Sequence, residues 1–510
     1  MSCRDVCRER GYDDGIEYGI ARRYVETRRW GLWETFREFV QNALDEMHEV
    51  RGARPREYPC EVEYKGYTPV TVIADEGRGL SIHHLLLGTS EKKAWQRGKF
   101  GEGLKLALLA SAHRGIDVLI RSGDKEIVPT FVTRIIEGVP VDVFCVCYKS
   151  GLPAVRGTRV EIRGHRLCDE YSDRFVQGLP TECFKFSLED KEWYDIIDKR
   201  CTNHKPYVYV RDIYVTTMYD AEGKPAGFSY NLFNVTIDES RRIPSGGSIR
   251  EEIRYLWHLV AWRASKGDLK AYETLKEVLS FIVKNCRPGY GPDIPVEVDM
   301  DTFTRVYDEE AEAVREAFEE LYGEDTIFIH DEELRKFAEY VGAKHVYCPQ
   351  PVGYSLERML KTIEKLRRHM EKKVKGVVRK EDMPPKLRQA AEILEELVHI
   401  LFYLAPAEVK IQYAMLEEDF HAMSDMQTKT ITLNLWHFDR YCRRYWESCV
   451  PWYISAFGHE LAHIYSRAND GTVEFERALT EIMGVATTKA ILESTKIAEL
   501  VRRLDQVLRS

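Results

Sequence analysis

The chain lacks several features that would assign it to a familiar class. No apolar run approaches the roughly 20 residues that a helix needs to cross a bilayer, so we expect no membrane span. The opening MSCRDVCRERGYDDG has no apolar signal-peptide core. There is no GxxxxGK[ST] phosphate loop, and no CxxC pair suggests a zinc ribbon. Twelve cysteines in 510 residues are too few for a disulfide scaffold, so we expect a cytoplasmic protein with reduced thiols.

The composition is that of a globular protein with several domains. Hydrophobic residues make up 44% of the chain, which is enough for sizeable cores. Lysine and arginine number 74 against 83 aspartates and glutamates, and the net charge of −9 argues against a nucleic-acid partner. At roughly 150 residues per domain, the length predicts about three domains. We expect an α+β multidomain fold divided into 1–245, a mostly helical 246–384, and 385–510.

Hydrophobic periodicity predicts much of the secondary structure. Apolar residues spaced by three or four predict a helix over 15–50. Alternating patterns predict two strands over 58–75 and an antiparallel meander over 116–162. In the last region we expect a helix over 386–404, then strands, then two long helices that the NDG at 469–471 separates.

Polar residues occupy one face of the predicted helix around residue 40. Glu38 precedes Asn42 by four residues, so both side chains project from the same side. An asparagine oxygen can hold Mg²⁺, and a neighbouring glutamate can orient a water molecule as a general base. Taken alone, the pattern also fits an amphipathic surface helix.

Three later segments add residues that suit a nucleotide. In VTVIADEGRGL, a strand delivers a carboxylate into a glycine turn, where it can accept a hydrogen bond from an exocyclic amine. GKFGEGLK opens a helix whose backbone N–H groups can bind phosphates, and GTRVEIRG is a turn that enters a strand. The candidate binding residues are Asp75, Gly77, Gly79, Gly98, Gly101, Gly103, Lys105 and Thr158.

Together and in this order, these segments resemble the GHKL ATPase superfamily over roughly residues 15–165. The resemblance implies an N-terminal Bergerat α/β sandwich that binds ATP and Mg²⁺. It implies that Glu38 is the general base for attack on the γ-phosphate, and that Asp75 and Thr158 contact adenine. It also implies that residues 80–97 cover the bound nucleotide.

Near the C-terminus, FGHELAHIYS contains an HExxH sequence in a helical pattern. His459 and His463 lie four residues apart, so both imidazoles face one side of a helix and can share a zinc ion. Glu460 can act as the general base toward a metal-bound water. The alternative is a core helix with two satisfied histidines, but the small or apolar residues between them favour a buried active-site helix.

This region resembles the zincin metallopeptidases, particularly the gluzincins, over roughly 405–495. The resemblance implies a zincin-like α+β domain in which a glutamate from the following helix is the third zinc ligand. Glu476 is the preferred candidate, and Glu474, Glu481 and Asp470 stay open as alternatives.

Two such sites on one chain predict an ATP-regulated or ATP-dependent zinc metallopeptidase. By the resemblance, the strand at 428–434 pairs with an extended peptide, and ATP binding closes a homodimer. We expect an unfolded protein or peptide substrate, the cofactors ATP, Mg²⁺ and Zn²⁺, and no membrane or nucleic-acid partner. The alternative is a chaperone-like or DNA-associated GHKL ATPase whose zincin domain is structural or degenerate.

Overall fold

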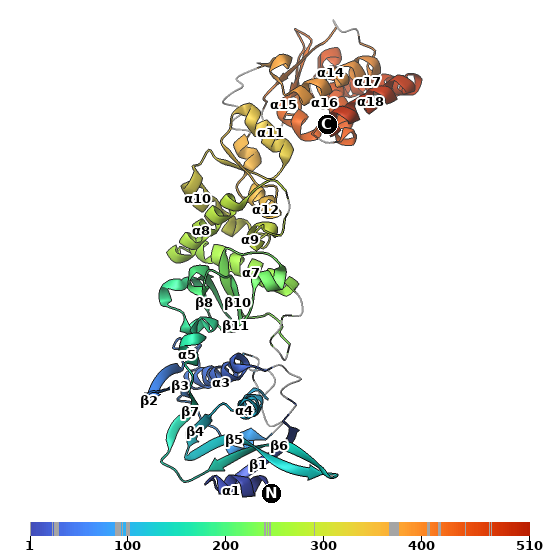
Figure 1. Cartoon of the computed structure of the whole chain (residues 1–510). Helices are drawn as coiled ribbons and strands as arrows, with labels where there is room; N and C mark the ends of the chain where they lie inside the picture. The colour runs from blue at the N-terminus through green and yellow to red at the C-terminus, as the bar shows by residue number, and fades with distance from the viewer. Residues whose placement is uncertain are drawn as a thin grey trace. The chain divides into compact units, whose positions relative to one another are not determined.

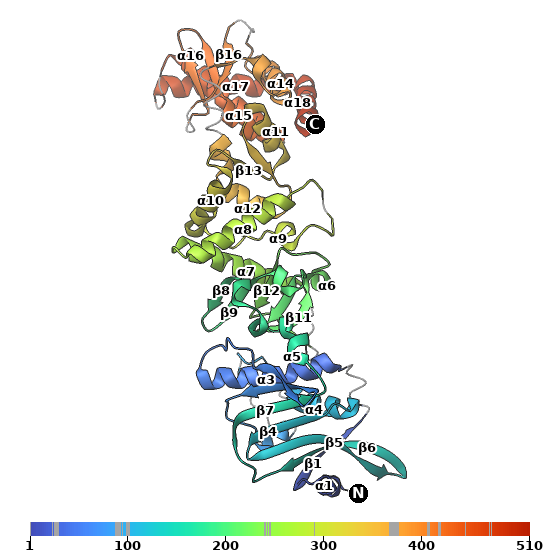
Figure 2. The ribbon, with the colours of Figure 1, turned by 60° about the vertical axis from the view of Figure 1, so that its left-hand side comes forward.

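The computed structural model of the chain is a mixed α+β protein (Figures 1 and 2). It describes all residues except 1, 23, 25–29, 87–92, 94, 98–101, 239–240, 242, 244–245, 290, 367–376, 405–407, 417–419, 444, 469 and 471. The chain forms two compact units. Unit 1 comprises Met1–Asn285 and Tyr290–Ala317, and unit 2 comprises Cys286–Gly289 and Phe318–Ser510. The divisions that we predicted after 245 and 384 lie inside unit 1 and unit 2, respectively.

Unit 1 contains a seven-stranded antiparallel sheet in the order β1-β6-β5-β4-β7-β3-β2 (Figure 1). The long helices α3 and α4 pack on this sheet through a core that includes Phe36, Leu108 and Ile162. Strands β4 to β6 confirm the first part of the predicted meander, but β7, its last strand, pairs with β4 and β3 and not with β6. The elements are α1 (Cys3–Glu9), β1 (Asp14–Ala21), α3 (Leu32–Arg51), β2 (Cys60–Lys65), β3 (Thr68–Asp75), α4 (Gly103–Arg114), β4 (Val118–Gly123), β5 (Lys125–Ile136), β6 (Val139–Lys149) and β7 (Val155–Arg163).

The first part of the predicted 15–50 helix is a strand instead. The segment DGIEYGIA forms β1, which pairs with β6 from Asp14 opposite Tyr148 to Ala21 opposite Val143. The helical spacing behind the prediction comes from residues 33–47 and does not extend into this glycine-containing stretch. Helix α3 begins at Leu32, and its predicted apolar face is buried at Phe36, Val40, Leu44 and Met47.

A second sheet in unit 1 has five strands in the order β11-β10-β12-β9-β8. Arg54 joins it to the first part of the unit, because its guanidinium donates to Asp195 Oδ2 at 2.6 Å and to Asp212 Oδ1 at 2.5 Å. The elements are α5 (Leu167–Glu170), β8 (Phe184–Glu189), β9 (Trp193–Asp198), β10 (Tyr207–Val210), β11 (Ile213–Thr217), α6 (Met218–Glu222), β12 (Phe228–Leu232), α7 (Gly246–Ser265), α8 (Leu269–Asn285), α9 (Val296–Asp299) and α10 (Asp308–Tyr322), which continues into unit 2.

Unit 2 packs a four-stranded sheet, in the order β15-β16-β18-β17, against long helices (Figure 2). Leu397, Phe457 and Leu504 belong to its core. The predicted helices and strands of this region are present. The elements are β13 (Ile327–Ile329), α11 (Glu332–Val341), β14 (His345–Tyr347), α12 (Val352–Met359), β15 (Val377–Val378), α14 (Pro385–Leu401), β16 (Lys410–Ala414), β17 (Ala422–Asp425), β18 (Thr430–Asn434), α15 (Leu435–Tyr441), α16 (Trp446–Ser466), α17 (Val473–Leu492) and α18 (Ser494–Arg509).

The cysteines contradict the prediction of reduced thiols. All twelve are paired, as Cys3–Cys145, Cys7–Cys147, Cys60–Cys168, Cys183–Cys201, Cys286–Cys348 and Cys442–Cys449. Most partners are far apart in sequence, and only the fold brings their sulfur atoms together, so their spacing gave no signal. Among the described helices, none is long and apolar enough to cross a membrane.

Candidate nucleotide and metal sites

Unit 1 contains a cavity of about 1060 Å³ between α3, the start of α4 and the sheet. Small-molecule sites typically measure about 300–1,000 Å³ and combine apolar walls with a few polar groups. Here Ile73, Ile120 and Val160 contribute apolar wall. The cavity brings together residues from each predicted nucleotide segment, namely Glu38, Asn42, Asp75, Gly79, Gly103 and Thr158.

Glu38 lies on α3 with its side chain only 8% exposed. The neighbouring Arg37 donates to Glu38 Oε1 from Nε at 3.1 Å and from Nη2 at 2.8 Å. A Cβ atom on Gly103, the first residue of α4, would collide with Glu38 Oε2. A glycine at this position therefore lets the N-terminus of α4 approach the carboxylate, which places the predicted base beside the predicted phosphate-binding backbone.

Asn42 lines the same cavity one turn further along α3. Its Nδ2 atom is buried and has no hydrogen-bond partner within the described part of the chain. The oxygen and nitrogen of a carboxamide are distinguished only by their hydrogen bonds, so the group can present its oxygen to a cation. Buried polar atoms nearly always have partners, and a bound ligand would supply one here. Asn42 therefore fits the predicted role of Mg²⁺ ligand.

Asp75 ends β3 and is 9% exposed. Its Oδ1 accepts hydrogen bonds from the backbone N–H of Gly77 at 2.8 Å and of Thr158 at 3.3 Å. Burial raises the pKa of Asp75 to about 6, although these two backbone hydrogen bonds oppose the rise. A buried carboxylate that can be ionised at neutral pH is suited to accept a hydrogen bond from a ligand amine.

Two glycines allow neighbouring segments of backbone to pack closely around Asp75. Gly157 has φ +68°, and a Cβ there would collide with the Asp75 carbonyl oxygen. Gly79 has φ +79°, and a Cβ would lie 3.0 Å from Ser122 Oγ. Ser122 in turn donates to the Gly157 carbonyl at 2.9 Å. The predicted glycine turn and the Gly-Thr turn are thus neighbours across the sheet and both need the left-handed backbone that glycine tolerates.

Part of the predicted site lies outside the described residues. This applies to Gly98 and Gly101 and to positions 87–92 and 94 of the predicted cover. Residues 82–85, which precede them, form a short 3-10 helix whose Leu85 is buried. The phosphate-facing loop is therefore represented in the structure by Gly103 alone among the predicted glycines of GKFGEGLK.

Lys105 is not among the described residues that line the cavity. It is 3% exposed on α4, and burial lowers its pKa. Leu104 and Leu106 are among the residues that line the cavity, whereas Lys105 is not. The phosphate contact predicted for Lys105 therefore stays a prediction.

Two buried arginines beside the cavity were not predicted individually as site residues, although Arg97 ends the predicted cover. Arg241 lies shortly before α7, lines the cavity, and donates to the Gln41 side chain and to the Arg97 carbonyl. Its Nη1 atom is buried without a partner in the described part of the chain, and burial lowers its pKa to about 10. Arg97 bonds to Asp45 on α3 and to Asp212 between β10 and β11. An isolated arginine in a segment without a repeating pattern gives no indication in the sequence that it will lie beside a cavity.

In unit 2, a carboxylate lies close to both histidines of the HExxH sequence. His459 Nε2 lies 3.2 Å from Asp470 Oδ1, and His463 Nε2 lies 3.5 Å from the same atom. Ligands at 2.0–2.2 Å from a tetrahedral zinc ion lie about 3.3–3.6 Å apart, so both histidine–aspartate distances suit zinc ligands. All three ligand atoms lie within 4.8 Å of one another. The Ala468 carbonyl lies 2.8 Å from His463 Nδ1 and directs Nε2 toward the group. Both imidazole rings also contact Phe475.

The third member of this group is Asp470, an alternative in our prediction, and not the preferred Glu476. Among the described residues of unit 2, the group that could hold a metal is His459, His463 and Asp470. Helix α17 presents Phe475 to the histidines, so Glu476, the next residue, points elsewhere and is exposed. Glu474 and Glu481 are exposed as well. The carboxylate therefore comes from the turn between α16 and α17, and not from helix α17.

Glu460 lies between the two histidines on α16 and is 8% exposed. The His459 side chain is 41% exposed, whereas that of His463 is 12% exposed. The candidate metal group therefore has one accessible side, while the predicted general base is sheltered. This combination suits a site that a substrate reaches from solvent.

The edge of the unit 2 sheet differs from our prediction. We expected the strand at 428–434 to be the free edge, but β18 pairs with β16 on one side and with β17 on the other. Strand β17 (Ala422–Asp425) forms the edge and packs against helix α16. No clear pattern in the sequence predicts this short strand, which pairs with the outer side of the expected edge strand.

Comparison with known proteins assigns no family. No protein-family model matches the chain, and no curated protein matches it significantly. The functional interpretation therefore depends on the residues and their geometry.

Proposed function

We propose that the chain is an ATP-regulated zinc metallopeptidase. The observation that carries this proposal is the group of His459, His463 and Asp470, spaced as three ligands of one zinc ion beside the buried Glu460. A structural zinc site usually has four protein ligands and needs no general base. Three ligands leave a position for water, so the arrangement supports catalysis over a structural role.

The residues of unit 2 divide the proposed chemistry among them. Zinc held by the three ligands would polarise a peptide carbonyl and acidify a water molecule. Glu460 is suited to take the proton from that water and to pass it to the departing amine. Strand β17 is an edge strand beside α16, so an extended peptide that pairs with it would run along the metal-binding helix.

In unit 1, we propose that the cavity binds ATP with Mg²⁺. Asp75 would accept a hydrogen bond from the adenine amine. Asn42 would hold Mg²⁺ through its carboxamide, whose buried Nδ2 atom has no hydrogen-bond partner in the described part of the chain. The unpartnered Nη1 of Arg241 would donate to a phosphate oxygen. Glu38 would orient the attacking water at the N-terminus of α4.

Nucleotide control of the peptidase requires that ATP bind two states of the protein with different affinity. Arg97 is the last residue of the predicted cover of the nucleotide and bonds to both α3 and the second sheet. A movement of the cover would therefore be transmitted to these elements within unit 1. We propose an unfolded protein substrate and a homodimer. A cytoplasmic location would require disulfides to persist inside the cell, as they do in hyperthermophiles.

Zinc analysis under non-reducing conditions, combined with cleavage of casein, tests the proposal. Wild type should carry one zinc per chain, and His459→Ala/His463→Ala should carry none. Glu460→Gln should keep the zinc but lose cleavage, because an amide cannot accept the proton. Glu481→Gln, an exposed change on α17, is the matched control and should retain both. Full zinc occupancy in the double-histidine variant would overturn the proposal, as would wild-type cleavage by Glu460→Gln.

A further inference from the structure

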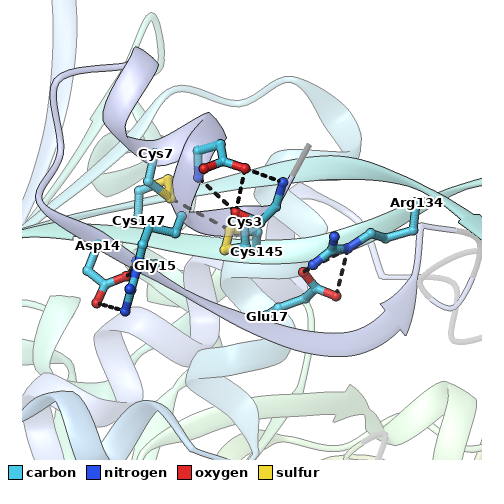
Figure 3. The surroundings of a disulfide bond; sticks show 11 residues. Cys3, Cys7, Asp14, Gly15, Glu17, Arg134, Cys145 and Cys147 are labelled. Atoms are coloured by element: carbon cyan, nitrogen blue, oxygen red, sulfur yellow. Dashed lines mark hydrogen bonds and ion pairs between the residues drawn. A yellow bond between two sulfur atoms is a disulfide. The ribbon is translucent and has the colours of Figure 1, made fainter.

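Four cysteine sulfurs meet at one edge of the seven-stranded sheet. Cys3 and Cys7 lie four residues apart on α1 and face the same side of the helix, while Cys145 and Cys147 lie two apart on β6 and face the same side of the sheet. Figure 3 shows the two pairs converging beneath α1, where they form two adjacent disulfides.

The sulfurs occupy a space that the neighbouring strand leaves open for them. Gly15 of β1 lies opposite Cys147 in the β1–β6 ladder. A Cβ on Gly15 would lie 2.5 Å from Cys7 Sγ, 2.7 Å from Cys3 Sγ and 3.4 Å from Cys145 Sγ (Figure 3). The backbone of β1 therefore accommodates the sulfur cluster only because this residue has no side chain.

The cluster is enclosed and largely apolar around the sulfurs. Its four cysteines are between 0% and 4% exposed. They pack with Val132 and Val143 and with partly buried residues of α1 and β5. An enclosed group of sulfur ligands of this kind suits a closed structural metal site.

The distance between the two disulfides is close to the sulfur–sulfur distance of a metal site. Cys7 Sγ and Cys145 Sγ, which belong to different disulfides, are 3.7 Å apart. The sulfurs of Cys3, Cys7 and Cys145 all lie within 4.8 Å of one another, and Cys147 is bonded to Cys7. Four thiolates around a tetrahedral zinc ion at 2.3 Å are about 3.8 Å apart. No other described cysteine belongs to a group of this kind.

We propose that these four cysteines form a redox-controlled metal site that binds one thiophilic divalent cation, Zn²⁺, when they are reduced. Each disulfide takes up two electrons and two protons from a two-electron reductant such as a dithiol or a phosphine, giving four thiols. Zinc binding then displaces up to four protons to form the tetrathiolate complex. The oxidised disulfides and the reduced zinc complex both fasten α1 to β6, so the site keeps this edge of unit 1 closed in either redox state.

Metal binding by the full chain tests this proposal without depending on the unit 2 site. The His459→Ala/His463→Ala variant, reduced with a phosphine under anaerobic conditions, is titrated with Zn²⁺ or with Co²⁺. We expect one ion per chain, and with Co²⁺ the intense thiolate-to-metal charge-transfer absorption of a tetrahedral tetrathiolate site. Oxidation to the disulfides should release the ion. No binding by the reduced variant, or a cobalt spectrum without thiolate bands, would overturn the proposal.

Cysteine variants on the same background locate the ion. Cys3→Ser/Cys7→Ser should abolish binding, and Gly15→Ala should weaken it by crowding the sulfurs. Cys183→Ser/Cys201→Ser is the matched control, because it removes one isolated disulfide of unit 1 and should retain the ion. Equal loss in the control, or retention after Cys3→Ser/Cys7→Ser, would contradict the assignment. If a cysteine variant fails to fold, the cobalt spectrum of the double-histidine variant, in which every cysteine is intact, still tests the proposal.

Discussion

Replacing Asp75 by asparagine should separate the stability of the unit 1 cavity from its ability to bind nucleotide. The asparagine Oδ1 can still accept the backbone hydrogen bonds from Gly77 and Thr158 that hold Asp75 in place. The substitution removes only the negative charge and replaces the second acceptor oxygen by a donor. An adenine amine would then face an amide N–H₂ group instead of a carboxylate.

The magnitude follows from the raised pKa of Asp75. A rise from the usual 3.8 to about 6 means that ionisation in the folded state costs up to about 3 kcal/mol. Because the folded-state pKa is raised, this cost is absent below about pH 4, grows as the pH rises, and is fully present above about pH 6. Asp75→Asn should therefore increase the free energy of unfolding of the nucleotide-free protein at pH 7, and change it little near pH 4.

Denaturant unfolding at both pH values, together with calorimetric titration of ATP, measures the two effects. We expect a more stable variant at pH 7 whose ATP affinity falls by about ten- to a hundredfold, the loss expected for one hydrogen bond to a charged group. Asp117→Asn, the same change at an exposed site of unit 1, should alter neither quantity. Unchanged ATP affinity would refute the adenine contact, and a variant less stable than wild type at pH 7 would refute the burial argument.

Three further predictions concern the other groups. Glu38→Gln should retain ATP binding and the contact with Arg37 but lower the hydrolysis rate by about 10²–10⁴-fold, and wild-type turnover would exclude Glu38 as the base. Asp470→Ala should weaken zinc binding by more than about 100-fold, since outer-shell changes alone cost 10–100-fold, whereas the exposed Glu476→Ala should leave it unchanged. A thiol assay on the denatured, unreduced chain should find no free cysteine, and several reactive thiols would contradict the disulfide pairs.

The spacing of residues along the sequence was sufficient to predict features that lie within a single helix. The 3/4 spacing in α3 predicted its buried face, and the separation of His459 and His463 by four residues predicted that they share one side of α16. Glu38 and Asn42 on α3, Asp75 at the end of β3 and Thr158 on β7 come from three separate segments, yet all four line one cavity.

The sequence was a poor guide wherever a role depends on contacts between distant segments. Strand β1 is defined by its partner β6, and Asp470 reaches the histidines only because the chain turns back after α16. The disulfides and the buried Arg241 depend in the same way on elements that are far apart along the chain. No periodicity within a single segment reports such contacts.

The central claim is that nucleotide bound in unit 1 controls a zinc peptidase in unit 2, and one measurement tests it most directly. The rate at which the zinc-loaded full chain cleaves an unfolded protein is compared without nucleotide, with ATP, and with a non-hydrolysable analogue, using Glu460→Gln as the inactive reference. We expect nucleotide to change the wild-type rate, and we expect this change to disappear in Asp75→Asn at equal zinc content. Zinc-dependent cleavage that proceeds at the same rate with and without nucleotide would contradict it.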